Sequence, residues 1–243
     1  MRICGQHVRI TVESHLAHQQ PASDWCGSRS KRVLDIILAT LALTVTAPLM
    51  LLIALGIRAT SPGPVLFRQW RLGLNGQQFQ LLKFRTMQDL GAESGPGVTR
   101  RGDLRVTELG QWLRGWKVDE LPQFFNVLRG EMSIVGPRPD LEQFWRQTTE
   151  VERMALAAKP GITGAATLTF SNEEELLAHI PESDLVEFYV RDLLPRKARL
   201  DYQYAAHASF WSDCRILVKT IVRLFSPSPI HNRLDKRNGN VSR

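Results

Sequence analysis

The chain has 243 residues, of which 43% are hydrophobic and 23% charged, and this excludes a disordered polypeptide, a collagen and a small disulfide-stapled domain. Its three cysteines form no CxxC pair, so we expect no disulfide framework or cysteine zinc site, and a reducing compartment is favoured. The net charge of +7 favours a negatively charged partner: nucleic acid, anionic lipid or a phosphorylated small molecule.

In chain order, the first distinctive segment is 36–57, which carries no charged side chain. A helix over it would be roughly 33 Å long, enough to cross a bilayer. Pro48, just past its middle, removes a backbone hydrogen bond and predicts a bend. Both flanks are basic, whereas a spanning helix gathers Lys and Arg at its cytoplasmic end. We therefore expect a re-entrant helix broken at Pro48, with a spanning helix and a buried core helix as alternatives.

A β-hairpin is predicted after the apolar segment. Residues 65–73 and 77–87 flank Asn75-Gly76, a pair that predicts a type I′ turn. Beyond it, apolar residues at helical spacing predict a short helix capped by Thr107.

The remainder reads as mostly helical. A helix is expected from about 120 to 128, with Asp119 as its cap and Gly130 as its stop. The other predictions are a longer helix over 140–158, a turn or loop at 160–164, a capping box at 171–174 and a final helix over 209–225. The final helix separates apolar residues from Arg215, Lys219 and Arg223, a composition typical of an interfacial membrane helix and also of a core helix with a solvated basic face.

These elements predict a mostly helical α+β fold: a re-entrant membrane helix, a small β-hairpin, a helical cytoplasmic domain and an amphipathic interfacial C-terminal helix. The expected segments are a polar N-terminal extension over 1–30, the membrane anchor over 31–62, the main domain over 63–226 and a basic tail over 227–243. The polar extension and tail are expected to be disordered.

The strongest candidate for chemistry is the acidic pair Asp119 and Glu120. Adjacent residues on a helix diverge by about 100°, so these carboxylates cannot act as a symmetric pair. They can divide labour, with one at a reacting phosphorus and the other near a metal, at a helix start suited to phosphate. The alternative is structural, because acidic residues at helix N-termini are common for reasons of capping and the helix dipole.

Basic residues around this pair favour the functional interpretation. Arg138 follows Pro137 and precedes a second proline, which restricts the backbone and positions the guanidinium for phosphate. Lys83 and Arg85 alternate with apolar residues on the second hairpin strand, and Arg114 lies shortly before the acidic pair. Each of these residues, taken alone, is equally well explained as a solvated surface charge. Together they predict a diphosphate site with Mg²⁺, which bridges carboxylates and substrate phosphates.

The order of motifs resembles the bacterial sugar transferase family, the small monotopic polyprenyl-phosphate phosphoglycosyltransferases. The resemblance covers about 30–226, and its segments include KRVLDIIL, SPGPVLFRQWRLGLNGQQFQLLKFRTM, DELPQFFNVLRGEMSIVGPRP and KPGITG. It implies transfer of a phosphosugar from a nucleoside diphosphate sugar, usually a UDP-sugar, to undecaprenyl phosphate with release of UMP. The setting it implies is the first membrane step of exopolysaccharide, O-antigen or glycoconjugate assembly, at the cytoplasmic face of the bacterial inner membrane.

The resemblance also implies that 63–226 is the catalytic domain, and it implies roles for individual residues. Asp119 would attack the β-phosphate to form a covalent phosphosugar intermediate, and Asp119 and Glu120 would hold Mg²⁺. The substrate phosphates would be held by the remaining candidates, namely Lys83, Arg85, Arg114, Pro137 and Arg138. The chain has Ala47-Pro48 where the family often has Ser-Pro, and AATLTFSNEEELL after PGITG instead of a Gln-Val-Asn-Gly-Arg-like segment.

The resemblance implies a phospholipid bilayer as partner and no nucleic acid, and it leaves homo-oligomerisation open. The alternative from another class is a non-catalytic, membrane-anchored basic module that binds anionic lipid or nucleic acid. Such a module would lose affinity steeply with salt and would be indifferent to Asp119 and Mg²⁺.

Overall fold

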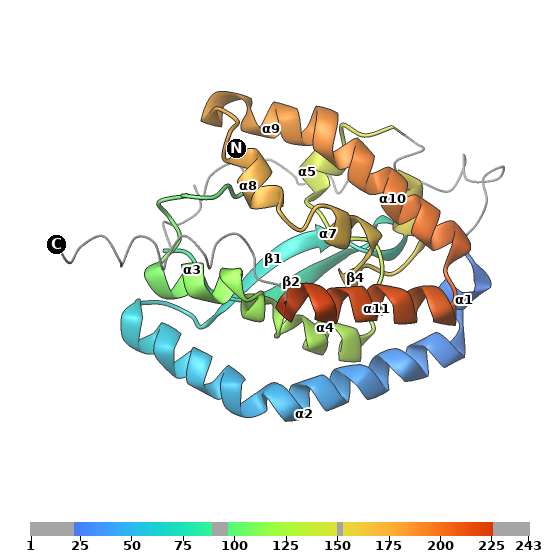
Figure 1. Cartoon of the computed structure of the whole chain (residues 1–243), viewed down its shortest axis with the longest axis horizontal. Helices are drawn as coiled ribbons and strands as arrows, with labels where there is room; N and C mark the ends of the chain where they lie inside the picture. Colours follow the sequence, from blue (N-terminus) through green and yellow to red (C-terminus); the bar gives the residue numbers. More distant parts are fainter. Residues whose placement is uncertain (1–21, 89–96, 150–152, 226–243) are drawn as a thin grey trace, which may run out of the picture.

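The computed structural model describes residues 22–88, 97–149 and 153–225 (Figure 1). It is mostly helical with a small β content, consistent with the expected α+β class. The α-helices are α1 (Asp24–Gly27), α2 (Arg29–Thr60), α3 (Glu108–Gly115), α4 (Gln123–Arg129), α5 (Glu142–Trp145), α7 (Ala165–Thr169), α8 (Glu173–Leu177), α9 (Leu185–Phe188), α10 (Leu194–His207) and α11 (Phe210–Phe225). The strands are β1 (Leu66–Leu72), β2 (Gln78–Phe84), β3 (Ser133–Val135) and β4 (Gly161–Thr163). Short 3-10 or π turns are η3 (Leu74–Gly76), η5 (Val118–Glu120), η6 (Met154–Ala157), η7 (Glu182–Asp184) and η8 (Tyr189–Leu193).

Helix α2 is the long apolar element expected over 36–57, and it is long and apolar enough to cross a membrane. It continues through Pro48, and Figure 1 shows it bowed along the body, with both ends turned toward the body. Only 11% of its most apolar stretch is buried, which argues against the core-helix alternative. The large apolar side chains that it exposes are Val33, Ile36, Ile37, Leu41, Val45, Leu49, Leu51, Leu52 and Leu55.

The first turns of α2 are held to the body by buried charges. Lys31 donates to Asp213 of α11 at 2.6 Å, and Asp35 accepts from the backbone N–H of Ile134 at 3.0 Å. Arg32 donates to carbonyl oxygens at the end of α4. Removing one partner of such a pair would leave an uncompensated buried charge. This end of α2 is therefore fixed relative to α4, β3 and α11.

The predicted hairpin is confirmed. Strands β1 and β2 pair antiparallel, ending at Leu72 opposite Gln78. Asn75 and Gly76 both have positive φ, at 53° and 73°, as a type I′ turn requires. The strand pairing stops earlier than expected, because the connecting residues 73–77 close on themselves through backbone hydrogen bonds.

The expected loop at 160–164 is wrong, because these residues contain β4, which pairs parallel with β3. Glycines permit the close approach of the two backbones. A Cβ at Gly136 would lie 2.2 Å from the carbonyl oxygen of Lys159, and one at Gly161 would lie 2.1 Å from the backbone N of Gly136. The pairing fixes the start of the Pro137-Arg138 segment.

Two further helix predictions are wrong. The helix expected over 140–158 is reduced to α5 and η6 in the described parts of that range, and 150–152 lie outside the described residues. The capping box also fails: α8 begins after Asn172, and no side-chain cap hydrogen bond forms there. In contrast, Thr107 caps α3 by accepting from the N–H of Gly110 at 2.9 Å, and α11 occupies most of the predicted final helix.

The predicted terminal segments are only partly visible. Residues 1–21 and 226–243 lie outside the described residues, which includes all of the expected tail. Within the expected N-terminal extension, residues 22–30 contain α1 and the start of α2. The indole N–H of Trp25 donates to Asp213 at 2.9 Å, so α1 is attached to α11.

Gly136→Ala should lower the free energy of unfolding by about 1–3 kcal/mol, because the added methyl group must push β3 and β4 apart. Gly115→Ala is the matched control, since nothing lies within 4 Å of a Cβ at that position. The control should change stability by less than about 1 kcal/mol. Thermal unfolding in detergent measures both variants, and equal melting temperatures would contradict the close approach.

Candidate active site

The acidic pair lies in a tight turn between α3 and α4. Lys117 leaves α3 with a positive φ of 57°, and Asp119 and Glu120 follow within the 3-10 turn η5. The prediction that Asp119 caps a helix starting at 120 is wrong, because Pro122 occupies the N-cap position and α4 begins at Gln123. The two carboxylates are consequently placed by the turn geometry rather than by a helix N-terminus.

A buried asparagine aligns this turn with the hairpin. The side chain of Asn126 on α4 accepts from the N–H of Leu82 at 3.0 Å and donates to the carbonyl of Gln80 at 2.7 Å. Its amide thus satisfies backbone groups of β2 that a neighbouring strand would otherwise pair with. Lys83 is the next residue along β2, so its side chain reaches the acidic turn.

Glu120 is the charged centre of the site. One of its oxygens, Oε1, accepts from Lys83 at 2.8 Å and from Arg138 at 3.3 Å. Burial alone would raise the pKa of Glu120, but the two cations outweigh burial and hold the pKa well below its usual range. In return, Glu120 raises the pKa of Arg138. The cluster joins β2, η5 and the segment after β3.

Asp119 has the opposite environment. Its side chain is buried, and Oδ1 has no hydrogen-bond partner among the described residues. Burial raises the pKa of Asp119, while the positive charges of Lys83 and Arg114 oppose the rise. An unsatisfied buried carboxylate oxygen is costly, and such atoms occur where a ligand or reaction uses them. The two neighbouring carboxylates are therefore chemically distinct.

The backbone of Arg138 is held from α10. Its N–H donates to Asp201 at 3.0 Å, and the other oxygen of Asp201 accepts from the N–H of Ala166 at 3.2 Å. Burial raises the pKa of Asp201 to about 6, and these two backbone N–H groups oppose the shift. Pro137 is buried, and its carbonyl accepts from the N–H of Gly161 at 2.8 Å. The sequence pattern gave no signal for Asp201, because its partners are distant in the chain.

The other predicted basic residues have different partners. Arg85 is buried, and its guanidinium donates to the carbonyls of Pro62 at 2.6 Å and Ser61 at 2.8 Å, just beyond α2. Arg114 pairs with Glu174 at 2.6 Å, at the edge of the site. The structure thus brings Lys83 and Arg138 into contact with the acidic turn, places Arg114 nearby and directs Arg85 to the end of α2.

The residues at the turn are compatible with Mg²⁺. Among the residues that the structure describes, no three His, Cys, Asp or Glu side chains form a group that could hold a metal by themselves. Mg²⁺ commonly binds one or two carboxylates together with substrate phosphates, and the unpartnered Oδ1 of Asp119 beside Glu120 fits that pattern. The metal itself remains a prediction.

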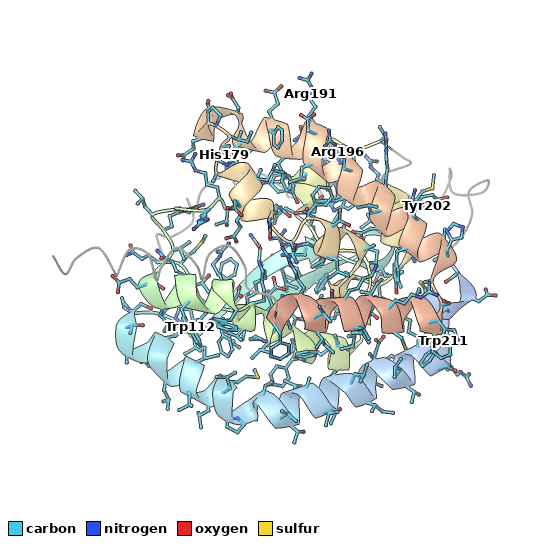
Figure 2. The ribbon with its side chains drawn as sticks, in the orientation of Figure 1. Trp112, His179, Arg191, Arg196, Tyr202 and Trp211 are labelled. Atoms are coloured by element: carbon cyan, nitrogen blue, oxygen red, sulfur yellow. The ribbon has the colours of Figure 1, made fainter. Side chains whose placement is uncertain are left out.

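Exposed aromatic side chains lie beside the acidic turn. Trp112 and Trp116 precede it and Phe125 follows it, and each is exposed by more than two fifths of its surface, at 53%, 45% and 43%. Figure 2 shows Trp112 on the side of the molecule where α2 runs. The site therefore borders the apolar surface that α2 presents.

Comparison with known proteins gives one consistent result. The model of the bacterial sugar transferase family matches residues 26–227. A "UDP-glucose:undecaprenyl-phosphate glucose-1-phosphate transferase" of Caulobacter vibrioides is 40% identical over 81% of this chain and 70% of its own length. A protein of the same name from Escherichia coli K12 is 37% identical over 80% of this chain. The "Exopolysaccharide production protein ExoY" of Rhizobium meliloti is 33% identical over 80% of this chain and 85% of its own length.

The chain spans different shares of these relatives. The match covers 40% of the Escherichia coli protein and 37% of an "Undecaprenyl-phosphate glucose phosphotransferase" of Komagataeibacter xylinus. Those two relatives therefore contain long segments with no counterpart in the matched region.

Lys83→Met should destabilise the protein more at pH 7 than at pH 4. A native pKa below the unfolded value of about 4.3 makes Glu120 stabilising above that pH, and this contribution is lost as the pH falls through the native pKa. Without Lys83, burial is less opposed and raises the native pKa of Glu120 above its unfolded value, so at pH 7 the variant keeps a destabilising charged carboxylate that is neutralised by pH 4. Thermal unfolding of both proteins at the two pH values measures the difference.

Arg146→Met is the control, because it breaks a surface pair with Glu142 that should contribute less than about 1 kcal/mol at either pH. An equal loss of stability at pH 7 and pH 4 in Lys83→Met would contradict the assigned cause of the lowered pKa.

Proposed function

The chain belongs to the bacterial sugar transferase family, and on that premise we propose that it transfers a phosphosugar from a UDP-sugar to undecaprenyl phosphate and releases UMP. The relatives that support this reaction are named as undecaprenyl-phosphate sugar phosphotransferases, and two are named for exopolysaccharide production. The observation that carries the proposal is the buried, unpartnered oxygen of Asp119 next to the Lys83–Glu120–Arg138 cluster.

In the first step, a carboxylate oxygen of Asp119 attacks the β-phosphorus of the UDP-sugar. The new bond joins this oxygen to phosphorus, the bond between the β-phosphorus and the bridging oxygen breaks, and UMP leaves with that oxygen. In the second step, a phosphate oxygen of undecaprenyl phosphate attacks the same phosphorus and displaces the Asp119 carboxylate. Two bulky anionic substrates can in this way use one site in turn.

The neighbouring residues stabilise negative charge during both steps. Lys83 and Arg138 are fixed by Glu120, so they are oriented before substrate arrives, and preorganised cations favour charge that develops on phosphoryl oxygens. Mg²⁺, held by Asp119 and Glu120 together with the diphosphate, would supply further neutralisation of the leaving group. Asp201 keeps the backbone of Arg138 in place through the N–H bond.

We further propose that α2 is re-entrant and that the protein is monotopic at the cytoplasmic face of the bacterial inner membrane. The bowed shape of α2, its exposed apolar face and its basic flanks support this arrangement. Figure 2 shows Trp112 and Trp211 toward the side of α2, and Arg191 and Arg196 on the side away from it. Aromatic residues at one face and charges at the other suit a protein seated on a lipid surface.

The comparisons do not favour the alternative of a non-catalytic basic module. The acidic turn also argues against nucleic acid as a ligand, because Asp119 and Glu120 repel phosphate unless a metal or substrate-specific cations intervene.

Asp119→Asn should reduce phosphosugar transfer by at least about a thousandfold, because the amide cannot act as the nucleophile. The variant should still associate with membranes, since α2 and α11 are unchanged. Product formation from labelled UDP-sugar, together with membrane fractionation, measures both properties. Retained turnover would refute the assignment of the nucleophile.

Membranes containing the protein, incubated with undecaprenyl phosphate and a panel of UDP-sugars, should release UMP with at least one sugar and only when Mg²⁺ is present. A chelator should abolish the release, and added Mg²⁺ should restore it. Release of UMP that persists in excess chelator would contradict the metal, and absence of release with every donor would contradict the proposed reaction.

A further inference from the structure

A groove separates the turn between α7 and α8 from the second half of α11. Its volume is about 420 Å³. The residues that line it are Leu168, Thr169, Ser171, Asn172, Lys219 and Arg223. Both charged residues among them are cations, Asn172 provides an amide, Thr169 and Ser171 provide hydroxyl groups, and Leu168 is apolar. The composition is that of a site for an anion.

The positive charge in this groove is not neutralised by the acidic residues next to it. Glu173 pairs with Lys197 at 3.0 Å and Glu174 with Arg114 at 2.6 Å, so these carboxylates are engaged elsewhere. Within the described ranges, Lys219 and Arg223 have no carboxylate within ion-pair distance. Arg223 donates to the side chain of Asn172 at 2.8 Å, which orients the guanidinium at the rim of the groove.

The same helix presents an apolar surface beside this groove. Thr220 and Asp213 face the core, where Thr220 contacts Thr163 and Asp213 binds Lys31. A separate face of α11 exposes large apolar side chains: Trp211, Val218, Ile221, Leu224 and Phe225. The basic stripe with Lys219 lies between these two faces. A ligand with an anionic head and an apolar tail can therefore contact both the groove and the exposed stripe.

The groove is connected to the acidic turn through one short segment. Ser171 and Asn172 line the groove, and Glu174 two residues later binds Arg114, whose charge acts on the pKa of Asp119. Helix α11 also contacts α7, and Figure 1 shows α11 below α7, with its C-terminal end toward α3. The groove therefore adjoins α8, whose Glu174 contacts Arg114, and the exposed apolar side chains of α11.

We propose that this groove binds the phosphate monoester of the lipid acceptor before the acceptor reaches the phosphosugar on Asp119. This inference rests on the proposed function and adds a site for the second substrate. A phosphate monoester carries a charge between about −1.5 and −2 at neutral pH and offers three acceptor oxygens, which two cations and an amide match. A phosphodiester headgroup has less charge and suits the pair of cations less well.

The test uses the full chain in nanodiscs of phosphatidylcholine, with the double variant Lys219→Met/Arg223→Met. Its KM for undecaprenyl phosphate should rise at least about tenfold, since charge-assisted hydrogen bonds are lost, while its KM for the UDP-sugar changes less than about twofold. Arg215→Met is the matched control, because it removes one charge from the same helix outside the groove. It should leave both KM values within about twofold. The single variant Lys219→Arg, with Arg223 unchanged, should do the same.

The outcomes separate the two proposals. Transfer by the unchanged protein with no effect of the double variant on the acceptor KM would overturn the groove while leaving the reaction intact. Failure of the unchanged protein to transfer phosphosugar would overturn the reaction itself. Nanodiscs with added phosphatidylglycerol, and inorganic phosphate as a soluble competitor, identify the source of the anion. Competition by phosphatidylglycerol that the double variant abolishes would assign the groove to phospholipid and overturn the acceptor site.

Discussion

Lys83 and Arg138 converge on one oxygen of the partly buried Glu120, at 2.8 and 3.3 Å, and this ion cluster holds the active site together. The three residues come from the hairpin, the turn η5 and the segment after β3. A buried carboxylate without its cations would be strongly destabilising, so the three segments must keep their relative positions. Asn126 and Asp201 fix the backbones of β2 and Arg138 in support of the same arrangement.

The cluster also divides the acidic pair. Its cations approach Glu120 directly and act on Asp119 only through space, so the pKa of Glu120 is lowered and that of Asp119 is raised by burial. Two carboxylates that are adjacent in sequence thereby acquire separate roles. Glu120 orients the two cations, and Asp119 keeps an oxygen without a hydrogen-bond partner among the described residues. A symmetric pair of carboxylates would have offered neither property.

Locally encoded elements were predictable from the sequence. The hairpin around Asn75 and Gly76, the cap at Thr107 and the final amphipathic helix depend on neighbouring residues alone. Strand β4 was missed because its partner β3 is distant in the chain and only glycines reveal the contact. For the same reason, strand alternation placed Arg85 on the face of Lys83 but gave no indication that its guanidinium binds the carbonyls beyond α2. The role of Asp201 could not be predicted, because no local sequence pattern marks it.

The attachment of α2 at both of its ends affects how the enzyme can be handled as a soluble protein. Lys31 reaches Asp213 at one end, while Arg85 holds the residues after Thr60 at the other. Deleting α2 to obtain a water-soluble truncation would remove Lys31 from the buried Asp213, release the segment that Arg85 binds and uncover the apolar cluster around Phe84 and Leu113. Helix α2 is therefore a packed part of the domain rather than a detachable tether, and we expect its removal to destabilise the rest of the fold.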